Sequence, residues 1–317
     1  MPKLADKVIT GELPIDKFIT HNFEGLDKIE DLIHALHGGD CLRGVLKIGA
    51  YEVREKPKIE IISNQKVHGG CIKTLKHWSV VNNCYMTFSI FLPENEVNKQ
   101  RSEPYPTLYY LAGLTSTHEN APQKSGFAPH AKKHGIAVVF PDTSPRNIEG
   151  YTPVDIKDSW LVGYGAGFYC DATAEPWSKN FNMYTYIVEE LPRIVEAYFP
   201  VKKGVRSIAG HSMGGNGSLM IAARNPGLYK SVSAFAPIAN PSNKDSKFAV
   251  EAMTRYFADN LEVAKEYDCS IAIRKAAKIP NGLVDFGTHD EYMTSLQPQA
   301  LIDALGEGGH KNVKFRW

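Results

Sequence analysis

The pentapeptide Gly210 to Gly214, read as Gly-His-Ser-Met-Gly, is the feature that most restricts the fold of this chain. An apolar, strand-like run from Val205 to Ala209 precedes it, and a helix-like run from Ser218 to Asn225 follows it. A serine in this context lies on a sharp strand-to-helix turn that pushes its side chain out of the sheet. Flanking glycines are needed because a Cβ atom there would contact the neighbouring strand and helix. The pattern predicts serine-hydrolase chemistry at Ser212, and the alternative is a glycine-rich turn that only packs a helix against a sheet.

A serine nucleophile needs a base and an orienting acid, which in such folds follow in the order serine, acid, histidine. Downstream of Ser212, residues 283–286 form an apolar, strand-like run, and residues 287–290 form the turn after it. Asp285 belongs to the predicted strand, so we expect its side chain to face a packed surface. Asp290 belongs to the loop at the carboxyl end of the strand, where catalytic groups collect in open α/β sheets. We predict Asp290 as the acid, and the alternative is a turn aspartate that binds its own backbone.

The sequence contains no convincing base. His310 is the only histidine after Asp290, and it occupies a polar turn before the strand-like run from Val313 to Trp317. That turn is at the amino end of the last strand, opposite the serine. His289 precedes Asp290 and breaks the expected order, and His211, next to the serine, should point away from it. We therefore expect the triad to be incomplete.

Strand-like and helix-like runs alternate from residue 59 onward. The expected strands include residues 86–92, 108–111, 136–140, 231–235 and 283–286, and residues 184–199 form an expected helix. Alternation of this kind predicts a mostly parallel central sheet with helices on both faces. Together with the serine turn, it assigns the chain to the α/β class and to the α/β-hydrolase fold.

Composition is that of an ordinary globular protein of one large or two smaller domains, with 43% apolar and 22% charged residues among 317. The formal net charge of +1 argues against a nucleic-acid or membrane-surface partner. No run reaches the length of a membrane-spanning helix, and the start lacks the apolar core of a signal peptide. The five cysteines are odd in number and lack metal-ligand spacing, which favours reduced thiols in a cytoplasmic protein.

Residues 1–48 differ in character from the rest. They contain one amphipathic, helix-like stretch over residues 25–36 and one strand-like run over residues 45–48, which is too little to bury a core alone. We expect residues 49–58, which are rich in charge, to be a linker. The hydrolase domain is then expected to span residues 59–317.

From residue 59 onward the sequence resembles the S-formylglutathione hydrolase family, also called esterase D. The matching segments, in the family's order, are residues 69–70, 111–115, 141–146, 165–169, 190–192, 210–215, 229–238 and 240–241. Members hydrolyse the thioester of formate and glutathione during the glutathione-dependent removal of formaldehyde. The resemblance implies a cytoplasmic serine thioesterase with S-formylglutathione as its small-molecule substrate and with no cofactor. Members are commonly dimeric, so it also implies a homodimer.

The resemblance further implies roles for four residues. Ser212 would be the nucleophile and would form a formyl ester that water then cleaves. Asp290 would be the acid. The backbone N–H groups of Leu114 and Met213 would form an oxyanion hole, which stabilises the negative charge that develops on the formyl oxygen. A general carboxylesterase is an alternative, because the same site would also attack simple esters.

The sequence departs from the family pattern at three places. Ser116 replaces a cysteine close to the active site, which should alter thiol sensitivity more than the core chemistry. A Trp-Gly pair is missing from residues 241–245, which puts local packing in doubt. The family's histidine lies in a Gly-Tyr-Asp-His-Ser segment beyond the Phe-Arg strand, whereas this sequence ends at Trp317. We therefore expect the base and the final helix to be missing, apolar sheet surface to be uncovered, and the fold to be weakly stable.

Residues 1–48 resemble the carboxyl-terminal tail of class III alcohol dehydrogenase, the glutathione-dependent formaldehyde dehydrogenase, through residues 18–22 and 42–48. That enzyme makes the hydrolase's substrate, so a fusion has metabolic logic, although a chance extension is the alternative. In an intact dehydrogenase the residue matching Arg43 would contact the coenzyme phosphates. The dinucleotide-binding domain and zinc ligands are missing, so we expect no NAD or zinc binding. The chain is then a fragment of a fusion cut at both ends, or a short, catalytically impaired α/β-hydrolase-like protein.

Overall fold

The structure divides into two compact units, Met1–Lys56 and Pro57–Trp317. The computed structural model describes residues 21–24, 31, 34, 44–47, 58–94, 103–146, 148 and 159–317. In the first unit, strands β1 (His21–Glu24) and β2 (Gly44–Lys47) pair in parallel. The predicted helix over residues 25–36, apart from residues 31 and 34, lies outside the described residues, and so does the predicted linker, apart from its last residue.

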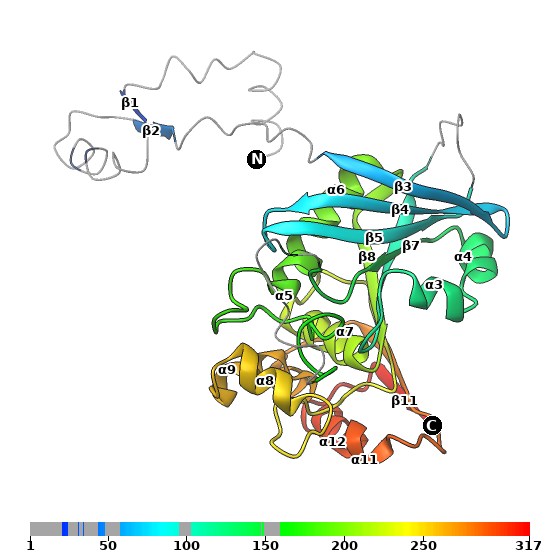
Figure 1. Cartoon of the computed structure of the whole chain (residues 1–317), viewed down its shortest axis with the longest axis vertical. Helices are drawn as coiled ribbons and strands as arrows, with labels where there is room; N and C mark the ends of the chain where they lie inside the picture. Colours follow the sequence, from blue (N-terminus) through cyan, green and yellow to red (C-terminus); the bar gives the residue numbers. More distant parts are fainter. Residues whose placement is uncertain are drawn as a thin grey trace. The chain divides into compact units, whose positions relative to one another are not determined.

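A nine-stranded sheet forms the centre of the second unit (Figure 1). Its strands are β3 (Ile59–Val67), β4 (Gly70–Ser79), β5 (Cys84–Leu92), β6 (Tyr105–Leu111), β7 (Ala137–Pro141), β8 (Val201–His211), β9 (Ser231–Phe235), β10 (Asn281–Asp285) and β11 (Val313–Arg316). The spatial order is β11-β10-β9-β8-β6-β7-β5-β4-β3. The six strands from β11 to β7 run parallel, and β5, β4 and β3 continue the sheet in antiparallel pairing. The predicted mostly parallel sheet is confirmed.

Strands β3 and β4 were not predicted as elements, for different reasons. Most β3 side chains are exposed on both faces, so its sequence lacks the alternation of apolar and polar residues that marks a half-buried strand. A register irregularity between Ile61 and Ser63 shifts the pattern further. Strand β4 pairs with both β3 and β5 and is mostly buried, but the buried polar residues His77 and Ser79 interrupt its apolar pattern.

Side chains alternate between the two faces of the sheet, as the two-residue period of a strand requires. On β7, Ala137 and Val139 enter the main core, whereas Val138 and Phe140 join a smaller cluster on the opposite face. The smaller cluster includes Ala128 from α4 (Ala128–His134), which follows α3 (Asn120–Lys124). Helices therefore cover both faces, as predicted (Figure 1).

The other helical elements contribute to the main core. They are α5 (Met183–Thr185), the π-turn Tyr186–Glu190, α6 (Leu191–Tyr198), α7 (Met213–Arg224), α8 (Val250–Tyr256), α9 (Leu261–Ala264), the 3₁₀ turn Lys265–Tyr267, α10 (Cys269–Lys275), α11 (Met293–Leu296) and α12 (Pro298–Glu307). The helix predicted over residues 184–199 is the continuous run from α5 to α6. Within the described residues, every helix is too short or too polar to span a bilayer.

The face that carries α3 and α4 also has a hollow of about 600 Å³ over strands β6, β8 and β9. Leu108, Tyr110 and Phe235 line it and are only partly buried.

Candidate active site

Ser212 lies on a sharp turn between β8 and α7, as predicted. Its backbone has φ +56° and ψ −117°, in a region that non-glycine residues rarely adopt. Three backbone hydrogen bonds hold it there: Ser212 N donates to Phe235 O at 2.9 Å, and Ser212 O accepts from Asn216 N at 3.1 Å and Ile238 N at 3.2 Å. Backbone strain that neighbouring elements hold in place is typical of functional sites.

The two glycines of the pentapeptide allow α7 to approach the sheet. A Cβ atom built on Gly210 would lie 2.1 Å from the carbonyl oxygen of Gly214, and one on Gly214 would lie 2.0 Å from that of Leu111. Neither distance is compatible with a side chain. The glycines therefore do pack the helix against the sheet. This close packing also positions Ser212 at the turn.

A second loop, residues 113–116, lies against Ser212. A Cβ atom built on Gly113 would lie 3.2 Å from Ser212 Cβ. None of the backbone hydrogen bonds between described residues uses the Leu114 N–H as donor. Met213 is the first residue of α7, so its N–H has no acceptor within the helix. Both N–H groups that the sequence assigns to an oxyanion hole are thus free of backbone partners in the described part of the chain.

Thr115, next to Leu114, adopts φ +65°, which is strained for a β-branched residue. Its N–H donates to Gly165 O at 2.8 Å, and Gly165 must be glycine because a Cβ atom there would lie 2.8 Å from Thr115 Cα. The loop is therefore held in a strained conformation by a neighbouring segment.

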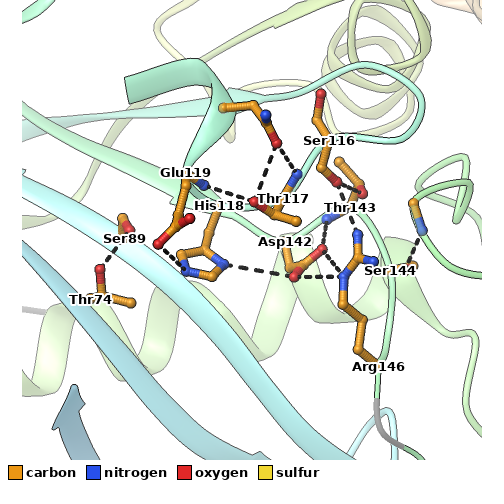
Figure 2. Close-up of polar contacts among 12 residues, drawn as sticks. Thr74, Ser89, Ser116, Thr117, His118, Glu119, Asp142, Thr143, Ser144 and Arg146 are labelled. Carbon is orange, nitrogen blue, oxygen red and sulfur yellow. Dashed lines mark hydrogen bonds and ion pairs between the residues drawn. The ribbon is translucent and has the colours of Figure 1, made fainter. Parts of the chain in front are cut away.

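A buried ion pair also holds this loop (Figure 2). The Arg146 Nε–H is shared between Asp142 Oδ1 at 3.1 Å and Oδ2 at 3.0 Å, and Arg146 Nη2 donates to Ser116 O at 3.1 Å. Thr143 Oγ1 donates to the same Ser116 carbonyl. Asp142 is 6% exposed, and His118 Nδ1 lies 3.7 Å from its Oδ2. Residues 141–146 match the family in sequence, but the sequence alone does not predict that they hold this loop.

Asp290 has both of the features that the sequence left as alternatives. Its Oδ1 accepts from Tyr292 N at 2.8 Å, as a turn aspartate does, and the residue lines the same cavity as Ser212. Asp285 instead pairs with Arg316 on the neighbouring strand, where Nε donates to Oδ2 at 2.5 Å. Asp285 is half-buried and Arg316 is exposed, so this ion pair does not show the packed surface expected around Asp285.

The cavity has a volume of about 570 Å³ and is lined by Ser212, Leu114 and Asp290. Part of its lining is aromatic: the ring centroids of Trp160 and Phe248 lie 6.0 Å apart, and those of Phe248 and Tyr292 lie 5.4 Å apart. A mostly apolar cavity with a few polar groups is the usual form of a small-molecule site.

His211 lines the same cavity as Ser212, and the expectation that its side chain points away from the serine stays a prediction. His211 is the last residue of β8, so its side chain extends at the end of the sheet instead of packing within a layer. Desolvation lowers the pKa of its imidazole below the ordinary value, and the opposing effect of Asp290 is smaller. The lowered pKa favours the neutral form of the ring.

The other two histidines lie outside the cavity lining, as the sequence implied. His310 is buried, with Nε2 2.9 Å from Ile273 O, and His289 is exposed, with Nδ1 3.0 Å from Thr288 Oγ1. Among the described residues, no histidine is hydrogen-bonded to Ser212.

The segment that lacks the family's Trp-Gly pair is packed by a different contact. Ser242 donates to Asp268 Oδ2 through its N–H at 3.0 Å and its hydroxyl at 2.7 Å. Asp268 is fully buried and also caps α10. These bonds hold Ser242, whereas Lys244 in the same segment is exposed.

Comparison with known proteins agrees with this geometry. A model of a family described as putative esterases matches residues 79–306. The S-formylglutathione hydrolase of Paracoccus denitrificans is 42% identical over 248 residues, which are 78% of this chain and 85% of that protein. The chain belongs to the S-formylglutathione hydrolase family. The member from Arabidopsis thaliana is 45% identical over 256 residues, covering 80% of this chain and 85% of its own length.

The fold of the family is also shared. A solved structure of the S-formylglutathione hydrolase from Agrobacterium tumefaciens matches with a TM-score of 0.73 and 35% identity, covering 81% of this chain and 88% of the other. The esterase model begins at residue 79, so the dehydrogenase-like character of residues 1–48 stays a prediction.

Proposed function

We propose that the protein is a serine thioesterase that hydrolyses S-formylglutathione to formate and glutathione. The observation that carries the proposal is the strained turn at Ser212, which opens into one cavity with Leu114 and Asp290. Ser212 is the nucleophile, Asp290 is the acid, and the N–H groups of Leu114 and Met213 form the oxyanion hole. Relatives that share about two fifths of the sequence carry this activity in their names.

In the first half of the reaction, Ser212 Oγ attacks the formyl carbon. The hydroxyl proton passes through a base to the sulfur as the C–S bond breaks, which yields free glutathione and a formyl ester on Ser212. Negative charge on the formyl oxygen is stabilised by the two backbone N–H groups, each of which typically lowers the barrier by about 3 kcal/mol. Water then adds to the ester, and formate leaves as the serine hydroxyl is restored.

Catalysis at full rate requires a base that contacts Ser212 Oγ. We propose an imidazole that enters the cavity where both Ser212 and Asp290 are accessible. Such a group would accept the serine proton and be oriented by the carboxylate, as in other Ser-His-Asp sites.

A second candidate function is that of a catalytically impaired α/β-hydrolase-like protein. It is favoured by the absence of any histidine hydrogen-bonded to Ser212 among the described residues. A site of this kind without its base keeps only about 10³–10⁴-fold catalysis over water, from the oxyanion hole and binding. A general carboxylesterase would use the same site.

The test is hydrolysis of S-formylglutathione by the chain as given and by a version extended after Trp317 with the family's histidine segment. Each form is compared with its Ser212→Ala variant. Ser212-dependent activity in the extended form alone supports the thioesterase and the assignment of the base. Activity in neither form refutes the proposal. Full activity in the unextended form would mean that the base is already present, and His289 and His310 would be substituted next.

We further propose that residues 1–48 are a dehydrogenase-like remnant, that residues 49–58 are a linker, and that residues 59–317 are the hydrolase domain. A cytoplasmic location is supported by four buried free thiols, those of Cys71, Cys84, Cys170 and Cys269. A homodimer is supported by the resemblance alone.

A further inference from the structure

The cavity at Ser212 has an uneven distribution of charge. Of the residues that line it, Asp290 and Lys124 carry a full charge, and the lowered pKa of His211 favours its neutral form. Lys124 ends α3 and is exposed. None of the salt bridges between described residues includes its ammonium group. A lysine without an ion-pair partner is thus available in a site that otherwise has one carboxylate.

The neighbouring lining adds further donors. Asn120 lies four residues before Lys124 on α3, a spacing that places two side chains on the same face of a helix, and both line the cavity. Asn120 Oδ1 accepts from Thr117 N at 2.6 Å and Thr117 Oγ1 at 3.2 Å. These two bonds orient the amide so that its Nδ2 hydrogens remain for another acceptor. Ser125, which follows Lys124, also lines the cavity. This wall therefore offers donors to an anionic group.

We infer that Lys124 determines specificity by binding a carboxylate of the glutathione moiety, with Asn120 Nδ2 as a second donor. The inference rests on the proposed thioesterase function. Glutathione carries two carboxylates and one ammonium group, so most of its charge is negative. Asp290 repels a carboxylate near Ser212, and Lys124 attracts one to the α3 wall. With the formyl carbon at Ser212, the peptide therefore extends along the cavity toward Lys124.

Binding measurements test this inference without requiring catalysis. We would titrate S-methylglutathione, a thioether that Ser212 cannot cleave, and its diamide, which has no ester bond, into the full chain by calorimetry. Because Lys124 is exposed, we expect the wild type to bind the diacid about two- to fivefold more tightly than the diamide, the range of one exposed ion pair. Lys124→Met should abolish this preference, Lys124→Arg should retain part of it, and raised salt should weaken it in the wild type.

Lys133→Met is the matched control, because Lys133 is an exposed lysine of α4 that does not line the cavity. It removes the same charge and should leave the preference unchanged. An undiminished preference in Lys124→Met, or no preference in the wild type, overturns the inference. The proposed function is tested separately by Ser212-dependent hydrolysis of S-formylglutathione. If S-formylglutathione is hydrolysed but Lys124→Met keeps the preference for the diacid, only the role of Lys124 is refuted. If the preference depends on Lys124 but no hydrolysis is observed, only the thioesterase function is refuted.

Discussion

Replacing Gly214 with alanine should destabilise the protein even though alanine is the better helix former. A Cβ atom at this position would lie 2.0 Å from the carbonyl oxygen of Leu111, whereas ordinary contact begins at 3.4 Å. The backbones of α7 and β6 must therefore separate by about 1.4 Å, the difference between these two distances. Overpacking of this severity costs about 3 kcal/mol, and the gain in helix propensity returns about 1 kcal/mol. The expected net loss in the free energy of unfolding is about 2 kcal/mol.

Gly306 provides a control of opposite sign. It lies within α12, and a Cβ atom built there meets no other heavy atom within 4 Å. Gly306→Ala should therefore stabilise the protein by about 0.5–1 kcal/mol through helix propensity alone. In thermal unfolding, we expect Gly214→Ala to melt about 4–8 °C below the wild type and Gly306→Ala about 1–4 °C above it. Urea unfolding should give the same order of stability with unchanged slopes.

The reasoning would be refuted if Gly214→Ala were at least as stable as the wild type. The same substitution should also affect catalysis, because Leu111 leads into the loop that carries Leu114. A displacement of about 1 Å between Ser212 and an oxyanion donor is expected to lower turnover by about 10²-fold in whichever form of the chain is active.

Two other substitutions follow from the contacts around the site. Arg146→Met should lower the free energy of unfolding by about 2 kcal/mol, because it removes the guanidinium partner of the buried Asp142 carboxylate and a donor to Ser116 O. Urea unfolding measures this loss. Arg146→Lys should recover only part of it, because lysine lacks the planar fork, and wild-type stability in Arg146→Met would contradict the prediction. His211 should titrate below the ordinary histidine pKa of 6.5 in NMR, with the resonance identified by its loss in His211→Gln, because desolvation lowers its pKa. The unfolded state then binds more protons, so the contribution of His211 to stability is complete above pH 6.5 and is lost as the pH falls from 6.5 through its lowered folded-state pKa. An imidazole whose pKa is at or above the ordinary histidine value would contradict this prediction.

Elements with a strong local pattern could be predicted from the sequence. Strand β9 has the predicted bounds, Ser231–Phe235, and β5 begins two residues before the predicted start, at Cys84. Short or edge elements could not be predicted, because β3 is exposed on both faces and α3 has no buried residue to give it a period.

The sequence alone determined the turn at Ser212, because Gly210 and Gly214 are a local requirement of a strand that passes directly into a helix. It also determined that Asp290 follows a strand. Only the tertiary structure decided which groups share the cavity, since Leu114, Lys124 and Asp290 come from loops and helices far apart in the chain. Their meeting depends on β8 lying between β6 and β9, an order set by long-range pairing and packing that local patterns do not encode.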